Sequence, residues 1–288
     1  MLSPTPSPAL DAQPVKLNAK PVAAEYGFGA AWVSIDAGTS DDPRVVRIDH
    51  RTKKVGLTVK GPHRVGVGTD AIWGAGSPEY MGKSTLRKFD PMTGKTLLAV
   101  QAPYPFDVSV ARQAVWITTM QDGVGRVNPR TGAIKLMRLP SEDVPDYILA
   151  TDAAVWVSSR DSGQVYRIDP DTNKVVAKIE APTPKDMVAY AGSIWVGSDD
   201  GPVARIDADT NRVTVIPGIG SVKAITACGD AVWAPHRDAG VYQIDPATNE
   251  AELALPFEPD THLGIACGDG ELWVTSISDF AVYHHTLG

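Results

Sequence analysis

The sequence predicts an all-β protein, a seven-bladed β-propeller of four-stranded antiparallel blades. Seven tryptophans follow one another at intervals of 41, 43, 40, 39, 38 and 40 residues, each at the end of a phrase such as AVW or SIW. A phrase of the type RIDP comes 12 to 17 residues after the tryptophan in six of the repeats. Each period also holds four short apolar or alternating runs separated by Gly, Asp, Asn and Pro. Tandem units of about 40 residues with four strands each are typical of propellers.

The fourth repeat illustrates how each unit is expected to fold. Its strands are predicted at Tyr147–Thr151, Ala154–Ser158, Gln164–Asp169 and Lys174–Ile179. The last two are joined by the run DPDTNK, in which Pro fixes φ and the Asx side chains cap the bend. Because no stretch keeps a 3.6-residue hydrophobic period, helices are expected to be almost absent.

The two ends of the chain complete this plan. Residues 1–12 are rich in Ser and Pro and are expected to form a flexible segment, whereas residues 13–288 form a single propeller domain. After Trp273 only one further strand, Phe280–Thr286, is predicted, which leaves the last blade one strand short. The β-compatible run Pro14–Asn18 is expected to supply that strand and close the ring.

The charge of the chain argues against two classes of function. The 27 Lys and Arg residues are outnumbered by 34 Asp and Glu residues, which gives a formal net charge of −7 and a pI near 5.3. An acidic chain without a basic run lacks the patch that nucleic-acid binding requires. No apolar run has the length of a membrane-spanning helix, so no membrane insertion is expected. We expect a soluble monomer.

The cellular compartment has two interpretations. The N-terminus lacks the basic and apolar regions of a signal peptide. We favour a mature periplasmic or secreted protein, and a cytoplasmic protein is the alternative.

Cys228 and Cys267 occupy matched places in two repeats, in the phrase ACGD. We interpret them as buried free thiols, because equivalent positions in adjacent blades are often too far apart for a disulfide, which is the alternative.

The tryptophans also have two interpretations. They could form a stacking surface for a ligand, but a large ring at the same position of every blade is better explained as filling the gap between neighbouring sheets. The seven are Trp32, Trp73, Trp116, Trp156, Trp195, Trp233 and Trp273.

Two positions of the repeat vary from blade to blade and are the candidates for function. They lie ten and nine residues before the tryptophan, with one extra residue in the last blade, at the expected start of the innermost strand. In a propeller these strand starts surround one mouth of the central channel. A mixture of charges there suits a small anionic or zwitterionic ligand, although it could merely solvate the mouth. The first position reads Val22, His63, Phe106, Asp146, Lys185, Lys223 and His262, and the second reads Ala23, Arg64, Asp107, Tyr147, Asp186, Ala224 and Leu263.

Loops on the same face extend the candidate site. Long loops at Asp36–Pro43 and Ser77–Ser84 could form a lid or partner surface, or could be neutral insertions. His236, in the loop of the sixth repeat, adds to the rim. The ligand-binding candidates are therefore His63, Arg64, Asp107, Asp146, Tyr147, Lys185, Asp186, Lys223, His236 and His262.

Motifs for catalysis are scarce. The chain has no Cys/His zinc spacing, no Gly-x-Ser-x-Gly elbow and no phosphate loop, so no metal site is predicted. Only a histidine of the channel mouth, His63 or His262, with a pKa near neutrality and an Asp across the ring could perform acid–base chemistry.

One phrase resembles a known family. The run from His262, HLGIACGDGELWVT, resembles the repeat of the streptogramin B lyases (virginiamycin B lyases), which are seven-bladed propellers, and the RIDP-x-TN-x-V phrases are similar to YVTN-type propellers. The resemblance implies opening of a cyclic depsipeptide by elimination, with Mg²⁺, a channel-mouth His and a Glu just past the Trp phrase. His262 matches the histidine, whereas Ser276 stands in the place of the carboxylate.

Two functional hypotheses follow. The first is a non-catalytic propeller, without a cofactor, that binds a small polar or anionic ligand or a protein partner at the channel mouth. The alternative is a lyase-like, Mg²⁺-dependent C–O lyase acting on a cyclic depsipeptide or related ester. Its candidate residues are His262, His63 and Asp146 or Asp107.

Overall fold

The computed structural model is all-β in the part of the chain that it describes. The described segments contain β-strands and no α-helix. None of these segments is a helix with the length and apolarity that crossing a bilayer requires. The described residues are 13–36, 43–76, 84–111, 114–120, 123–140, 143–257 and 264–287, so the expected flexible segment 1–12 lies outside them.

The strands of the described residues form six antiparallel sheets. The first contains β2 (Pro21–Gly27), β3 (Ala30–Ile35), β4 (Arg44–Asp49) and β5 (Val55–Lys60). The second contains β6 (Arg64–Val67), β7 (Ile72–Gly76), β8 (Thr85–Phe89) and β9 (Thr96–Gln101). The third contains β10 (Pro105–Ala111), β11 (Ala114–Thr119), β12 (Gly123–Val127) and β13 (Ile134–Met137). The fourth contains β14 (Ile148–Ala150), β15 (Val155–Ser159), β16 (Gln164–Asp169) and β17 (Lys174–Glu180).

The remaining two sheets differ from this pattern. The fifth is seven-stranded and contains β18 (Pro184–Tyr190), β19 (Ser193–Asp207), β20 (Val213–Val222), β21 (Thr226–Cys228), β22 (Ala231–His236), β23 (Gly240–Ile244) and β24 (Ala251–Pro256). One residue pair, Val222 with His236, joins its β18–β20 half to its β21–β24 half. The sixth contains β25 (Ile265–Gly268), β26 (Glu271–Ser276), β27 (Ala281–Thr286) and β1 (Val15–Lys16).

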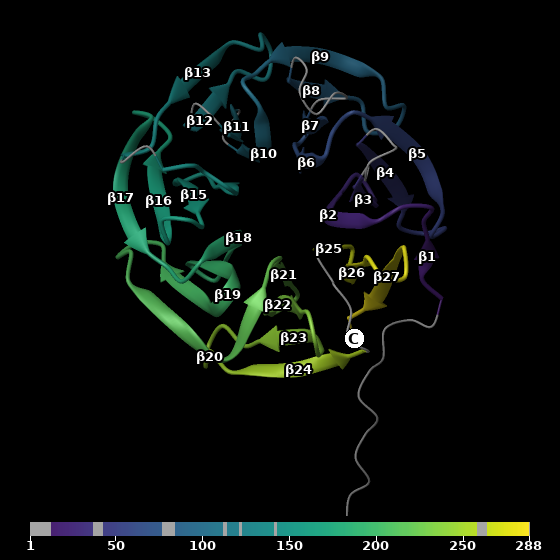
Figure 1. Ribbon diagram of the computed structural model, residues 1–288. Helices are drawn as coiled ribbons and strands as arrows, with labels where there is room; N and C mark the ends of the chain where they lie inside the picture. Colours follow the sequence, from purple (N-terminus) through teal and green to yellow (C-terminus); the bar gives the residue numbers. More distant parts are fainter. Residues whose placement is uncertain are drawn as a thin grey trace, which may run out of the picture.

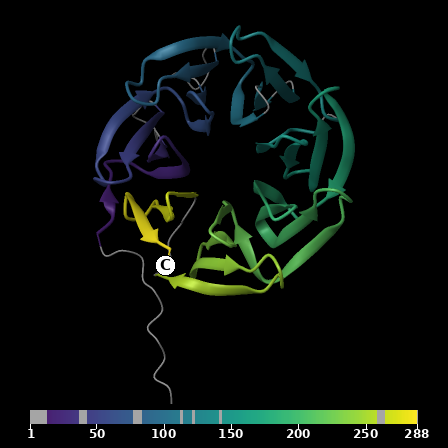
Figure 2. The same ribbon diagram turned by 180° about the vertical axis from the view of Figure 1, so that it is seen from behind.

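The sheets are arranged radially, as in a β-propeller. Figure 1 shows β2, β6, β10, β18, β21 and β25 nearest the central axis, with β5, β9, β13, β17, β20 and β24 on the circumference. Figure 2 shows the same ring from behind. The predicted strands of the fourth repeat agree with β14–β17 to within a few residues at each end. The turn between β16 and β17 is capped as expected, since Asp169 Oδ1 accepts a hydrogen bond from the Asp171 amide at 2.8 Å.

The N-terminal strand pairs with the last strand of the chain. Val15 lies opposite Val282 and Lys16 opposite Ala281, so β1 is the outer strand of the sheet formed by β25–β27. Leu17 packs against the apolar cluster that this sheet shares with the first sheet. Segments from the two ends of the described chain therefore lie in one sheet.

The tryptophans fill the spaces between neighbouring sheets, which confirms the structural interpretation. All seven are buried, with exposures between 0 and 6%. Trp32 of the first sheet packs with Val65 and Phe89 of the second. Trp273 of the sixth sheet packs with Val33 of the first, so the same contact recurs where the ring returns to its start.

Three arginines repeat one contact across successive interfaces. Each guanidinium lies over the tryptophan of its own repeat and donates a hydrogen bond to an Asn in a turn of the next repeat. Arg205, for example, lies 4.9 Å from the centre of the Trp195 ring, and its Nη1 is 2.9 Å from Asn249 Oδ1. The others are Arg126 with Trp116 and Asn173, and Arg167 with Trp156 and Asn211.

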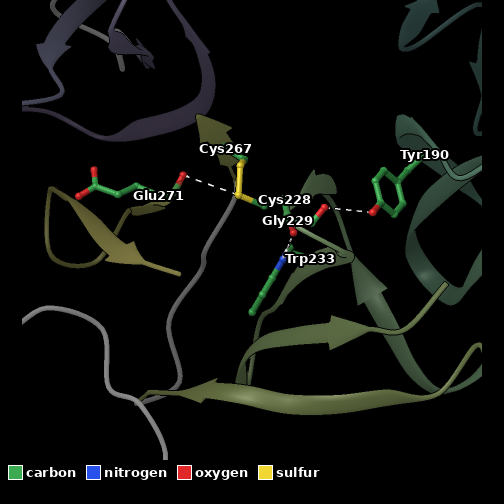
Figure 3. Close-up of a disulfide and its surroundings, with 6 residues drawn as sticks. All are labelled: Tyr190, Cys228, Gly229, Trp233, Cys267 and Glu271. Carbon is green, nitrogen blue, oxygen red and sulfur yellow. Dashed lines mark hydrogen bonds between the residues drawn. A yellow bond between two sulfur atoms is a disulfide. The ribbon is translucent and has the colours of Figure 1, made fainter. Parts of the chain in front are cut away.

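Cys228 of β21 and Cys267 of β25 form a disulfide, so the free-thiol interpretation is wrong. Their Cα atoms are 5.6 Å apart, within the range that disulfide geometry allows, because the innermost strands converge toward the axis. Figure 3 shows this bridge beside the Tyr190 hydroxyl, which donates a hydrogen bond to the Gly229 carbonyl at 3.0 Å. The segment around β21 is thus tied to both of its neighbours.

We expect deletion of Gln13–Ala19 to lower the melting temperature by many degrees. The deletion removes the β1–β27 pairing and uncovers the apolar surface on which Leu17 packs. Circular dichroism melts of the two proteins measure the effect. An equally long deletion of residues 3–9 serves as the control and is expected to change little. Equal melting temperatures for both deletions would contradict a stabilising role for β1.

Replacing both cysteines with serine is expected to lower the free energy of unfolding by about 4 kcal/mol, because the bridge closes a loop between residues 39 positions apart. Urea unfolding of Cys228→Ser/Cys267→Ser beside the oxidised protein measures this difference. An unchanged urea midpoint would show that the bridge adds no stability.

Candidate functional site

A cavity of about 250 Å³ lies on the axis, lined by the innermost strands. Its walls are mostly backbone and small apolar side chains, but several ionisable groups reach into it. Five of these, which we call the channel cluster, are Glu25, Arg64, Asp107, Tyr147 and Asp186. Lys223 lines the same cavity.

Two aspartates of the channel cluster connect neighbouring innermost strands. Asp107 and Asp186 each lie within a register shift at the start of β10 and β18, and such bulges re-aim side chains. Asp107 Oδ2 accepts a hydrogen bond from the Ile148 amide at 2.9 Å, and Asp186 Oδ2 accepts one from the Ile225 amide at 3.1 Å. Both carboxylates therefore fasten the strand beside their own as well as facing the cavity.

Arg64 and Tyr147 form the second part of the channel cluster. Arg64 Nη2 donates to the Tyr147 hydroxyl at 3.1 Å, and the guanidinium carbon lies 5.1 Å from the centre of the Tyr147 ring. Burial alone would lower the pKa of Arg64, but Tyr147, Asp107 and Asp186 outweigh it and hold that pKa above its usual value. The guanidinium is thus a permanent cation among carboxylates.

Glu25 was missed by the sequence analysis. Glu25 lies on β2, opposite Trp32 of β3, and its side chain lines the cavity. It is two residues beyond Ala23, the second variable position of the first repeat. The surrounding protein raises the pKa of Glu25 to about 8, first through burial and then through the charges of Asp186 and Asp107. A signal existed in the repeat, because the other six innermost-strand residues that lie opposite a tryptophan carry no ionisable group. They are Gly66, Ser109, Leu149, Val188, Thr226 and Ala266.

The other carboxylates of the cavity share this environment. Burial raises the pKa of Asp186 to about 7, against the opposing effect of its hydrogen bond from Ile225. Burial likewise raises the pKa of Asp107, and Arg64 opposes it. Three carboxylates share the cavity with Arg64 and Lys223, and Glu25 and Asp186 take up protons near neutral pH.

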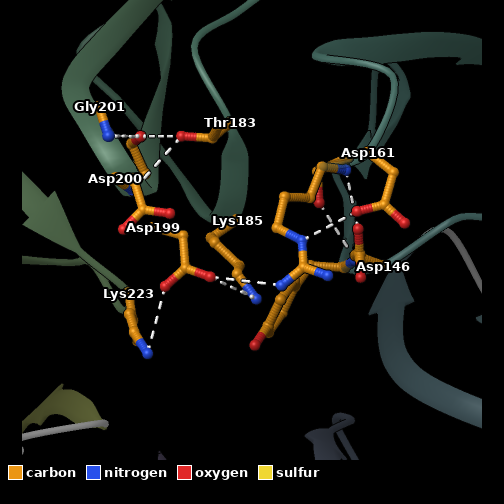
Figure 4. A network of polar contacts seen from close by, with 12 residues as sticks. Asp146, Asp161, Thr183, Lys185, Asp199, Asp200, Gly201 and Lys223 are labelled. Atoms are coloured by element: carbon orange, nitrogen blue, oxygen red, sulfur yellow. Dashed lines mark hydrogen bonds and ion pairs between the residues drawn. The ribbon is translucent and has the colours of Figure 1, made fainter.

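At the mouth, three cations surround one aspartate in a group that we call the rim network. Asp199 Oδ2 lies 3.3 Å from Arg160 Nη1 and 3.5 Å from Lys185 Nζ, and Oδ1 lies 3.2 Å from Lys223 Nζ. Figure 4 shows Lys185 and Lys223 pointing toward Asp199. Burial would raise the pKa of Asp199, but the three cations outweigh it and lower that pKa. Asp199 lies outside the two variable positions of the repeat and was not among the predicted site residues.

The remaining predicted residues are distributed around this site. Asp146 Oδ2 accepts a hydrogen bond from the Arg160 amide at 2.8 Å and so fixes the loop that carries a rim cation. His236 accepts the Asp238 amide on Nδ1 at 3.1 Å and caps its own turn. His262 lies outside the described residues, as do residues 37–42 and 77–83 of the two long loops.

His63 does not have the near-neutral pKa that was expected for an acid–base group. Its Nε2 lies 3.0 Å from the Phe106 carbonyl oxygen, and burial followed by the neighbouring Arg64 lowers the pKa of His63 to about 4. The imidazole is therefore neutral at pH 7 and cannot supply a proton as an imidazolium there.

The described residues do not fit the Mg²⁺ site that the sequence resemblance implies. Ser276 is fully buried in β26, and its hydroxyl accepts a hydrogen bond from the Asp279 amide at 3.1 Å. A neutral hydroxyl in this role does not replace a carboxylate as a ligand of a hard cation. No group of three or more His, Cys, Asp or Glu within the described segments is arranged to hold a metal ion.

Comparison with known proteins gives the fold. No protein-family model matches the chain, and no curated protein matches it in sequence. A solved structure of catalytically inactive virginiamycin B lyase from Staphylococcus aureus with quinupristin is 18% identical, with a TM-score of 0.74 over 94% of this chain and 97% of that one. The β-propeller domain of Cps50 (Swd1) from Myceliophthora thermophila is 11% identical, with a TM-score of 0.74 over 94% of this chain and 98% of that one.

A third similar structure belongs to BamB from Moraxella catarrhalis. It is 15% identical, with a TM-score of 0.64 over 91% of this chain and 83% of that one. At these identities the likeness concerns the fold, and it confirms that the chain is a β-propeller similar to virginiamycin B lyase in architecture.

Stability is expected to depend on pH through Glu25. The folded protein keeps the Glu25 proton up to about pH 8, whereas the unfolded chain loses it near 4.5, so this group makes stability fall as the pH rises across that interval. Glu25→Gln removes this loss. The variant should therefore melt higher than the parent by a few degrees at about pH 9 and at a similar temperature at about pH 5.

The exposed Glu180 of β17 provides the control, because Glu180→Gln removes the same charge far from the cavity. Its effect on the melting temperature should be small at both pH values. A difference between Glu25→Gln and the parent that is the same at both pH values would contradict the raised pKa.

Proposed function

We propose that this protein is a non-catalytic propeller that binds a small anionic or polar ligand at the channel mouth. The observation that carries the proposal is the rim network, in which Arg160, Lys185 and Lys223 converge on the single carboxylate of Asp199. Arg160 also pairs with Asp161, whose Oδ1 lies 3.1 Å from Arg160 Nε, so Lys185 and Lys223 are the two cations that share Asp199 and can turn to an anionic ligand. The cations come from three repeats, so the fold itself brings them together.

Two of the three rim cations, Lys185 and Lys223, are partly removed from water, whereas the side chain of Arg160 is 41% exposed. The side chains of Lys185 and Asp199 are 13% and 14% exposed, and that of Lys223 is 33% exposed. Charges that are partly removed from water interact more strongly than fully solvated ones. Asp199 also holds the cations in place before a ligand arrives, which reduces the entropy lost on binding.

The size of the adjoining cavity points to a small ligand. Its volume of about 250 Å³ is below the roughly 300–1,000 Å³ of sites for drug-sized molecules. A protein partner that covers the mouth is the other occupant we consider, and propellers in general use such faces for binding.

We further infer that the ring has seven blades and is closed by the N-terminal strand. Counting the two halves of the seven-stranded sheet as separate blades supports this number, because a single residue pair joins them. The pairing of β1 with β27 supports closure.

The disulfide supports a periplasmic or secreted location, because such bonds persist in oxidising compartments.

The lyase alternative has weaker support. It draws on the architecture shared with virginiamycin B lyase and on the sequence position of His262. The neutral, hydrogen-bonded Ser276 and the low pKa of His63 count against it. Mg²⁺-dependent opening of quinupristin by this protein, lost in His262→Ala, would replace the binding proposal with the lyase hypothesis.

We expect the rim cations to control anion affinity. Succinate and inorganic phosphate, titrated by calorimetry, should bind the parent protein, and Lys185→Glu/Lys223→Glu should weaken that binding by more than tenfold because it reverses two charges. Lys135→Glu/Lys174→Glu, on exposed outer strands, makes the same change in net charge and should leave affinity nearly intact. Lys185→Met/Lys223→Met removes the charges without adding carboxylates, in case the first variant folds poorly. Equal affinity in the parent and both rim variants would refute the proposal.

A further inference from the structure

Two groups of opposite charge lie one residue apart along the same strand. Lys185 belongs to the cationic rim network, and Asp186, the next residue of β18, belongs to the acidic channel cluster. Lys223, a second cation of the rim network, lines the same cavity as Asp186 and Glu25. Cationic and acidic groups of the mouth therefore face one small cavity.

Glu25 is the carboxylate in the channel cluster that is available to a ligand. Asp107 and Asp186 accept backbone hydrogen bonds from the neighbouring strands. Within the described part of the chain, the Glu25 carboxylate has no hydrogen-bond or ion-pair partner, although it projects into the cavity among the groups of the channel cluster. Glu25 is exposed to the cavity, so its carboxylate is open to an ammonium group, with which it would form a charge-assisted hydrogen bond.

We propose that the ligand of the channel mouth is a small amino-acid-like zwitterion, whose ammonium group contacts Glu25 in the cavity and whose carboxylate faces Lys223 and Lys185 of the rim network. This inference rests on the proposed function and specifies the ligand class of the same site. A cation that enters the cavity would be attracted by Asp107 and Asp186 and would favour the ionised form of Glu25. The cavity volume of about 250 Å³ favours small amino acids over large ones.

Binding of such a ligand releases a proton. Glu25 holds a proton below about pH 8, and an ammonium beside it favours the ionised form. The groups that face Glu25 and share this equilibrium are Asp186, Asp107 and Arg64, with Tyr147 and Lys223 on the same cavity wall. Affinity for the zwitterion should therefore rise with pH up to about 8.

The test compares ligands that differ in the ammonium group. The twenty standard amino acids are titrated one by one by calorimetry, and each one that binds is titrated again as its deaminated and its N-acetylated counterpart. We expect at least one amino acid to bind the parent at least tenfold more tightly than both counterparts. Repeating the titration in buffers of different ionisation enthalpy should reveal proton release.

Variants show which residues contact the ammonium group of the ligand and which contact its carboxylate. Glu25→Gln should remove the advantage of the amino acid over its deaminated counterpart while leaving the affinity for the counterpart unchanged, and Glu180→Gln should change neither. Lys185→Met/Lys223→Met should weaken both ligands.

The outcomes separate this inference from the proposed function. If succinate or phosphate binds but no amino acid binds better than its deaminated counterpart, the zwitterion inference is wrong and the anion site stands. If Glu25→Gln weakens the amino acid and the counterpart equally, the inference is also wrong. If no anion and no amino acid binds, both proposals fail.

Discussion

The packing of an indole ring between neighbouring sheets is the contact on which the rest of the structure depends. Each apolar face of a four-stranded sheet must be covered if the sheet is to be stable. The tryptophan of each repeat covers the face of the next sheet, and Trp273 does so for the first. Because an indole side chain fills a similar volume at every interface between sheets, the sheets take similar orientations about one axis. The starts of the innermost strands are brought together as a consequence.

This arrangement separates residues that maintain the fold from residues that can vary. The tryptophans, and arginines such as Arg205 that lie over them, occupy the interfaces and repeat along the chain. Side chains facing the axis contact few neighbours and can differ from repeat to repeat. Glu25 and Asp186 line a cavity enclosed by the surrounding sheets, where desolvation and neighbouring carboxylates raise their pKa values. The scaffold therefore gives ordinary carboxylates an unusual protonation behaviour.

The sequence was sufficient to predict the repeat, the strands and the buried tryptophans, because these follow from spacing and local composition. It was also sufficient to place Arg64, Asp107, Tyr147 and Asp186 together at the axis. Glu25 was missed because the direction of a side chain depends on the strand pleat and on register shifts near strand starts, which composition does not reveal. The disulfide was missed because the convergence of β21 and β25 is a property of the assembled ring.

The carboxylates of the cavity differ in how freely they can respond to a ligand. Asp107 and Asp186 are short side chains held by backbone amides of the adjacent strand, so moving either would leave a buried N–H without its acceptor. Glu25 is longer and carries no such bond within the described residues, so it can reorient at little cost. The two aspartates thus keep fixed positions, and Glu25 supplies the adjustable contact. The site can therefore accept a cation at Glu25 without disturbing the strands that form the cavity.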